Sequence, residues 1–152
     1  MNKALILGCS HASGCDLTAN GDYSFELSHS YPSLLAQKLG YEPVNLAFSG
    51  GSNDAIFRLY EQNFKNLESK DIVIACWTGS NRSEFWSREA QAYLKLCPGA
   101  TDFKNYEHER MFKQWVELAT DHPFGLTARL NKMKNILALN HLAQRSEEHT
   151  SE

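Results

Sequence analysis

A hydroxyl side chain follows directly on the first apolar run of the chain. Residues 4–7, Ala-Leu-Ile-Leu, lead into Gly8, and Ser10 comes two positions later. Gly8 permits a sharp exit from a strand, and small residues after Ser10 suit the start of a helix. In open α/β sheets, ligands and chemistry collect at the carboxyl ends of the strands. The sequence therefore indicates Ser10 as the first candidate for a reactive or ligand-binding group.

The same pattern occurs twice more along the chain. Residues 43–47 lead into Phe-Ser-Gly-Gly-Ser at 48–52, and residues 72–77 lead into Thr-Gly-Ser-Asn-Arg-Ser at 78–83. Segments with helical spacing separate the three apolar runs. Successive strands joined by helical crossovers predict a parallel sheet, so all three polar loops should fall on one edge. This convergence is the main functional indication of the pattern.

Further helices are expected around and after these strands. Residues 15–30 have the composition of a loop, with Ser30 as the cap of a helix that Gly40 ends. Ser52 or Asn53 is expected to cap the helix after the second strand. Beyond the third strand the spacing predicts three more helices, over residues 84–96, 105–119 and 126–143.

Three blocks of residues in this order resemble the SGNH (GDSL-type) hydrolases, including SGNH-type proteins of phages and environmental sequences. Residues 5–10, Leu-Ile-Leu-Gly-Cys-Ser, are similar to the block that carries the nucleophile. Residues 45–50 resemble the second block, and Gly-Ser-Asn at 79–81 resembles the third. The resemblance covers about residues 4–83 and implies a three-layer α/β/α fold with a flavodoxin-like parallel sheet.

The resemblance also implies a reaction, namely cleavage of an ester or acetyl group such as one on a carbohydrate. Ser10 would be the nucleophile. The backbone N–H groups of Ser10 and Gly50 and the side-chain amide of Asn81 would hold the developing oxyanion. His11 and Arg82 are expected to bind the substrate, a small molecule or a glycan ester. No metal and no cofactor is expected.

Two departures from the resemblance bear on activity. Cys9 stands where the family usually has aspartate, and the closing Asp-x-x-His block is missing. Asp121 and His122 are adjacent instead of spaced, and they precede a helix. His11 neighbours Ser10 in sequence, so the two side chains should diverge. The chain as written is therefore expected to be inactive.

The end of the chain is expected to be foreign to the fold. Residues 145–152, Arg-Ser-Glu-Glu-His-Thr-Ser-Glu, resemble a translated sequencing adapter and interrupt a helical pattern without a cap or turn. We expect residues 1–144 to form one hydrolase-like domain that is incomplete at its C-terminus. The missing acid and base would then lie beyond residue 144.

Other roles for the same residues stay open. Ser10 could cap a helix, Gly50 could serve a turn, and Asn81 could bond its own backbone. Cys9 could be the nucleophile, because a helix N-terminus lowers the pKa of a thiol. For the whole protein the alternatives are a non-catalytic module that binds a small ligand or a protein partner, and a binder of phosphate or nucleotide.

Composition narrows the class of protein. A chain of 152 residues, 42% hydrophobic and 22% charged, is ordinary for one globular domain. A net charge of -3 gives no reason to expect a nucleic acid or an anionic membrane as partner. No apolar run approaches the roughly 20 residues that span a bilayer, and we expect no signal peptide before the first strand. The cysteines lack zinc or CxxC spacing, which predicts reduced thiols in a cytoplasmic protein.

Overall fold

The computed structural model describes residues 1–79, 81–97, 103, 105–121 and 126–149. Its centre is a parallel sheet with the strand order β2-β1-β3, made of β1 (Lys3–Gly8), β2 (Glu42–Asn45) and β3 (Ile72–Cys76). β1 is the middle strand, and its last residue, Gly8, pairs with Cys76 at the end of β3. The predicted mixed α/β class and the parallel sheet are confirmed.

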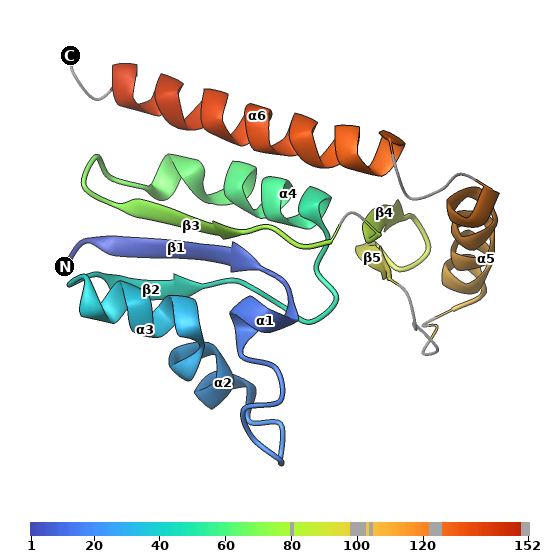
Figure 1. The fold of residues 1–152 in the computed structure, drawn as a ribbon, viewed down its shortest axis with the longest axis horizontal. Coiled ribbons are helices and arrows are strands. Elements are labelled where there is room, and N and C mark those ends of the chain that lie inside the picture. Colours follow the sequence, from blue (N-terminus) through green and yellow to red (C-terminus); the bar gives the residue numbers. More distant parts are fainter. Residues whose placement is uncertain (80, 98–102, 104, 122–125, 150–152) are drawn as a thin grey trace.

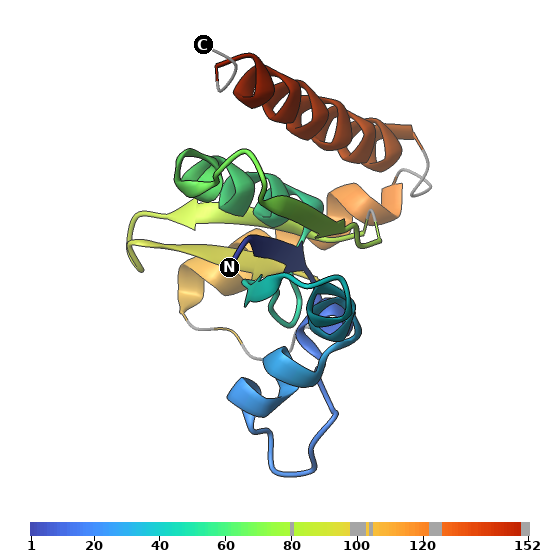
Figure 2. The same ribbon diagram turned by 90° about the vertical axis from the view of Figure 1, so that its left-hand side faces the viewer.

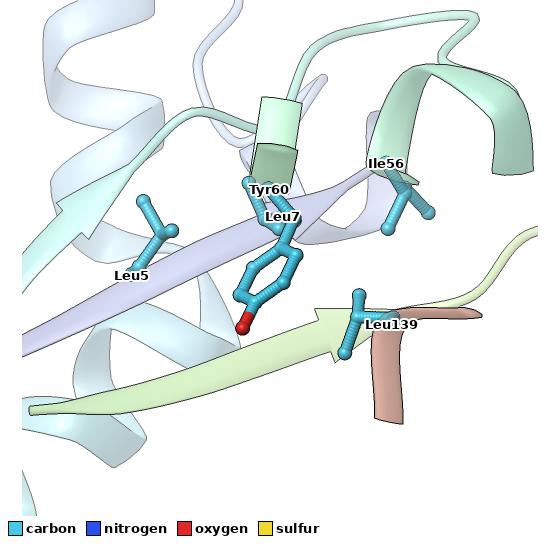
Figure 3. Packing of buried hydrophobic residues seen from close by; sticks show 5 residues of the cluster. All are labelled: Leu5, Leu7, Ile56, Tyr60 and Leu139. Atoms are coloured by element: carbon cyan, nitrogen blue, oxygen red, sulfur yellow. The ribbon is translucent and has the colours of Figure 1, made fainter. Parts of the chain in front are cut away.

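Helices cover both faces of this sheet. Side chains of β1 alternate between the faces, as the strand period of two requires. Leu5 and Leu7 pack with Ile56 and Tyr60 of α4 (Asn53–Asn63), whereas Ile6 packs on the side of α3 (Tyr31–Lys38). Figure 1 shows α4 on one side of the strands and α3 on the other, and Figure 3 shows the cluster under α4.

The last helix, α6 (Leu126–His149), lies over α4 on the side away from the strands, as Figures 1 and 2 show. Leu139 of α6 packs in the hydrophobic cluster around Tyr60. The predicted helix over 126–143 is confirmed and continues through residues 145–149, where the sequence suggested a foreign tail. α5 (Tyr106–Asp121) likewise confirms the helix expected over 105–119.

Two of the predicted helix signals are confirmed, and the third is confirmed in its position at the helix start but not in its side-chain bond. Ser52 caps α4, since its Oγ accepts a hydrogen bond from the N–H of Ala55 at 3.1 Å. Gly40 follows the end of α3 with a φ of +83°. Ser30 precedes α3 but does not cap it with its side chain, because its hydroxyl donates to the carbonyl of Leu27 at 3.0 Å.

Two short helices follow β1, and the second of them lies in the segment expected to be a loop, residues 15–30. α1 (Ser10–Ser13) follows β1 directly and ends at Gly14, whose φ is +76°. α2 (Tyr23–His29) begins after Asp22, whose carboxylate accepts from the N–H of Phe25 at 3.1 Å. The composition of residues 15–30 hid α2, because Asn-Gly-Asp at 20–22 has the residue types of a turn although its Asp22 caps a helix.

The helix predicted over residues 84–96 is wrong. This segment is an antiparallel hairpin of β4 (Ser83–Ser87) and β5 (Ala92–Leu96). Trp86 and Tyr93 pair across the strands with ring centroids 5.1 Å apart. Aromatic pairs of this kind stabilise a sheet, and the left-handed φ of +47° at Gln91 allows the tight turn. Pairing between the two strands therefore outweighs the helical spacing.

No helix among the described residues is long and apolar enough to cross a membrane. Within the same residues, β3 is bonded to β1 on one side and to no strand on the other.

Candidate functional site

A pocket of about 390 Å³ lies at the carboxyl ends of β1 and β3. Its walls come from the turn after β1, the start of α3 and the segment after β3. This is the edge at which the sequence placed the polar loops, and such edges are where open α/β sheets bind ligands. The lining residues are Cys9, His11, Ala12, Tyr31, Cys76, Trp77, Thr78, Gly79, Asn81 and Arg82.

Close backbone packing holds the turn after β1 against β3. A Cβ atom on Gly8 would lie 2.5 Å from the Cβ of Ala12 and 3.0 Å from that of Cys76. Any larger residue would push the start of α1 away from the sheet. A Cβ on Gly51 would likewise lie 2.9 Å from the carbonyl oxygen of Gly8, so the loop after β2 also touches this turn.

Two asparagines, the buried Asn53 and the half-buried Asn45, fix the loops around the pocket. Asn53 accepts a hydrogen bond from the N–H of Thr78 at 2.9 Å and donates to the carbonyl of Thr78 at 3.2 Å. The Nδ2 atom of Asn45, at the end of β2, lies 2.9 Å from the carbonyl oxygen of Ala12 and 2.9 Å from Oγ of Ser30. Asn45, part of the second sequence block, therefore positions α1 and α3.

Cys9 is a buried residue of the pocket lining, and its surroundings lower the pKa of its thiol. Burial raises the pKa of its thiol. Hydrogen bonds from the Thr78 hydroxyl and the His11 backbone N–H oppose this effect, as do the charge of Arg82 and the hydroxyl of Ser10. The net pKa lies below the ordinary value for a thiol. Cys9 is therefore predisposed to carry negative charge, the form in which a thiol reacts.

A second thiol in the lining has the opposite tendency. Cys76 accepts a hydrogen bond from the hydroxyl of Tyr31 at 3.1 Å. That bond raises the pKa of Tyr31 to about 12, while burial raises the pKa of Cys76. Both groups therefore stay protonated near neutral pH. All four cysteines of the chain are free thiols, as the sequence predicted.

Arg82 is the cation of the pocket. Its Nη1 atom is buried, and within the described part of the chain it has no hydrogen-bond partner. Glu84, the acidic residue nearest to it in sequence, pairs instead with Arg58, with Nε and Oε1 2.7 Å apart. None of the residues that line the pocket is an aspartate or a glutamate. The guanidinium thus faces a site without a carboxylate of its own.

The structure brings three of the predicted site residues to one pocket, namely His11, Asn81 and Arg82. Ser10 lies between the lining residues Cys9 and His11, is partly exposed and is not itself part of the lining. Its hydroxyl is one of the groups that lower the pKa of the Cys9 thiol. Within residues 1–79 and 81–97, no histidine ring hydrogen-bonds to that hydroxyl.

Gly50 lies outside the lining, on the loop between β2 and α4. Its φ is +78°, and a Cβ there would lie 2.9 Å from Cδ of Lys95 in β5. Lys95 donates to the carbonyl of Ser49 at 2.7 Å, so the hairpin covers this loop. The alternative base considered from the sequence, His122, falls outside the described residues, as does the side chain of Asp121.

Sequence reasoning missed Tyr31, Cys76 and Thr78 as parts of the site. The only signal for Cys76 and Thr78 was their position at the end of the clearest strand. Tyr31 is the first residue of α3, and nothing in the sequence indicated that this helix begins beside the pocket. Among the described residues, no group of three or more His, Cys, Asp or Glu side chains could hold a metal ion.

Comparison with protein families places the chain in one of them. Residues 16–144 match the model of a family of unknown function, DUF6071, and the chain belongs to that family. No curated protein and no solved structure matches it. The matched stretch includes Asn81 and Arg82 but leaves out the turn with Cys9 and Ser10.

This finding corrects the family expected from the sequence. The matching model is that of DUF6071, and no match to the SGNH hydrolases accompanies it. The three short blocks that suggested the SGNH family correspond to turns at three strand ends. Small and polar residues are favoured at such turns for their backbone conformations alone, so their order did not identify the family.

Proposed function

We propose that the pocket is the substrate site of an acyl hydrolase that cleaves an ester or acetyl group on a small molecule or a glycan. The observation that carries the proposal is the position of Ser10. It lies at the carboxyl end of the central strand, between two residues that line the pocket, and the amide-bearing Asn81 lines the same pocket. An uncharged amide donor suits an oxygen that gains charge only in the transition state.

The expectation of inactivity rested on the missing Asp-x-x-His block, and in the proposed reaction the Cys9 thiolate takes the place of that base. The Ser10 oxygen bonds to the carbonyl carbon of the substrate, and its proton passes to the thiolate sulfur of the adjacent Cys9, whose pKa is lowered. The carbonyl oxygen, which takes the electron pair, faces Asn81. Collapse of this intermediate expels the alcohol, which recovers the proton, and leaves an acyl group on Ser10 for water to remove.

The proposal extends to the architecture. The strand order β2-β1-β3 is the order in which a flavodoxin-like sheet begins, and α3 and α4 lie on its two faces. These observations support a three-layer α/β/α arrangement, in which the carboxyl end of β1 borders the switch in strand order where ligands bind.

A non-catalytic binding module is the second candidate. It is favoured by the absence of Ser10 itself from the lining and by the lack of a histidine on its hydroxyl within residues 1–79 and 81–97. In this function the pocket binds a small ligand without breaking a bond.

A fluorophosphonate probe separates the two functions. For the hydrolase, mass spectrometry should find one adduct on Ser10, absent in Ser10→Ala and formed more slowly in Cys9→Ala. Ser28→Ala, at an exposed serine of α2, should label like the unchanged protein. If the folded protein gains no adduct on Ser10, the hydrolase with a Ser10 nucleophile is refuted and the binding module is favoured. An adduct on Cys9 would instead show that the thiol is the nucleophile.

A further inference from the structure

The charge of Arg82 is not balanced by any carboxylate of the pocket. Its buried Nη1 atom lacks a partner within the described residues, and the lining contains no acidic side chain. A buried guanidinium nitrogen that has left water without gaining a hydrogen bond costs free energy. Within the described residues, the pocket therefore lacks a hydrogen-bond acceptor for Nη1 of Arg82.

Two acidic residues near the segment of Arg82, Glu84 two positions along the chain and Asp54 beside Ser83, have other partners. Both carboxylate oxygens of Glu84 accept from Arg58, at 2.7 and 2.9 Å. Asp54 accepts from Asn131 at 2.9 Å and from Asn135 at 2.8 Å, both from α6. Among the described residues, neither carboxylate forms a hydrogen bond or ion pair with Arg82. Cys9 is the group of the lining that can supply negative charge, and only in its thiolate form.

The remaining walls suit a small organic molecule. The volume of about 390 Å³ falls within the range of ordinary ligand sites. Ala12 and Trp77 offer apolar surface, whereas His11 and Asn81 offer nitrogen and oxygen atoms. A planar guanidinium binds a carboxylate with two parallel hydrogen bonds, which fixes both position and orientation.

We propose that the pocket takes a small molecule with a single free carboxylate, which binds Arg82, and with an apolar body against Trp77. With Cys9 in its neutral thiol form, the one permanent cation of the lining balances one negative charge, so a carboxylate is favoured over a phosphate dianion. This inference deepens the function proposed above and rests on it in one respect. If the pocket is the site of an acyl hydrolase, its substrates are esters or acetylated molecules that carry a carboxylate. Binding itself needs no reaction at Ser10.

Calorimetric titration with matched probes tests this inference. Benzoate and benzamide have the same ring and differ in charge, and phenyl phosphate adds a second negative charge. We expect benzoate to bind at least about tenfold more tightly than benzamide or phenyl phosphate. Arg82→Met should remove at least about tenfold of the benzoate affinity, and Arg88→Met, at an exposed arginine, should remove none.

Several outcomes would overturn the inference. These are equal affinities for benzoate and benzamide, undiminished binding by Arg82→Met, tighter binding of phenyl phosphate, or no binding of benzoate up to about 10 mM by the folded protein. If Arg82→Met does not fold, Arg82→Lys replaces it, since it keeps the charge and loses the paired hydrogen bonds. It should bind benzoate more weakly and keep the preference for benzoate over benzamide.

The titration and the phosphonate experiment fail independently. Benzoate binding without labelling of Ser10 would refute the hydrolase and leave the carboxylate site. Labelling of Ser10 without benzoate binding would refute the carboxylate site and leave the hydrolase. Ser28→Ala, at an exposed serine outside the pocket lining, should bind benzoate as the unchanged protein does.

Discussion

Asn53 and Thr78 exchange two hydrogen bonds, at 2.9 and 3.2 Å, in a buried part of the molecule. Asn53 is the first residue of α4, and Thr78 follows β3. The pair therefore fastens the segment after β3 to the start of a helix on the neighbouring connection. Its backbone bonds also fix the Thr78 side chain, whose hydroxyl acts on the Cys9 thiol.

Replacing Asn53 by alanine should destabilise the fold and disturb the pocket. The change leaves the buried N–H and carbonyl of Thr78 unpaired, so we expect a loss of about 2–3 kcal/mol in the free energy of unfolding in urea. Asn20→Ala, at an exposed asparagine, should change it by less than about 0.5 kcal/mol. Similar losses for the two variants would show that the pair does not hold the loops.

The pKa of Cys9 predicts an order of alkylation among the thiols. A lower pKa gives more thiolate at a given pH, and thiolate is the form that attacks iodoacetamide. The alkylation rate of Cys9 should therefore reach half its maximum at a lower pH than that of Cys76, whose pKa burial raises. Peptide mass spectrometry of samples quenched across a pH series gives both curves.

The charge of Arg82 contributes to the low pKa of Cys9, so its removal should move the Cys9 curve to higher pH. Arg88→Met serves as the control, because Arg88 is exposed and does not line the pocket. Coincident curves for Cys9 and Cys76, or no movement in Arg82→Met, would contradict the environment described for this thiol.

Gly8→Ala should destabilise the protein through steric overlap. The new Cβ would meet Ala12 at 2.5 Å and Cys76 at 3.0 Å, so α1 or β3 must shift, at a cost of about 1–3 kcal/mol. Chemical denaturation measures this loss. The double variant with Ala12→Gly removes the closer contact and should recover part of it. A Gly8→Ala protein as stable as the unchanged chain would show that this packing is looser than described.

The ion pair of Arg58 and Glu84 should contribute more to the free energy of unfolding than a surface pair does, because Glu84 is almost fully buried. It ties α4 to β4, and the guanidinium of Arg58 also lies 4.2 Å from the centre of the Tyr93 ring. Glu84→Gln should lower the free energy of unfolding by about 2 kcal/mol. The matched control is Glu109→Gln, which breaks the exposed pair with Lys113 and should cost less than about 0.5 kcal/mol. Equal losses would refute the comparison.

The sequence predicted the centre of the fold because local pattern and tertiary structure agree there. The apolar runs at residues 4–7 and 72–77 have the length and composition of buried strands, and they pair in register. Ser52 and Gly40 marked helix ends through chemistry that acts within a few residues. Residues 84–96 were misread because strand pairing, such as Trp86 with Tyr93, depends on the partner strand and outweighs the local helical spacing.

The pocket could be predicted only in outline. The carboxyl edge and the residues His11, Asn81 and Arg82 follow from which loops come after which strands. The presence of both Cys9 and Cys76 in the pocket lining depends on the register of β1 and β3. The contact of Tyr31 with Cys76 depends on how α3 packs. Short strand-end motifs also misled the choice of family, because turns at such ends favour the same residue types in unrelated proteins.

The most direct test of the proposed acyl hydrolase is to locate the acyl group left by an activated ester. The protein is incubated with 4-nitrophenyl acetate, quenched in acid and mapped by peptide mass spectrometry, beside Ser10→Ala and Ser28→Ala. The account predicts one acetyl group on Ser10, present in Ser28→Ala and missing in Ser10→Ala. Acetylation spread over surface lysines, with Ser10 unmodified in the folded protein, would contradict it.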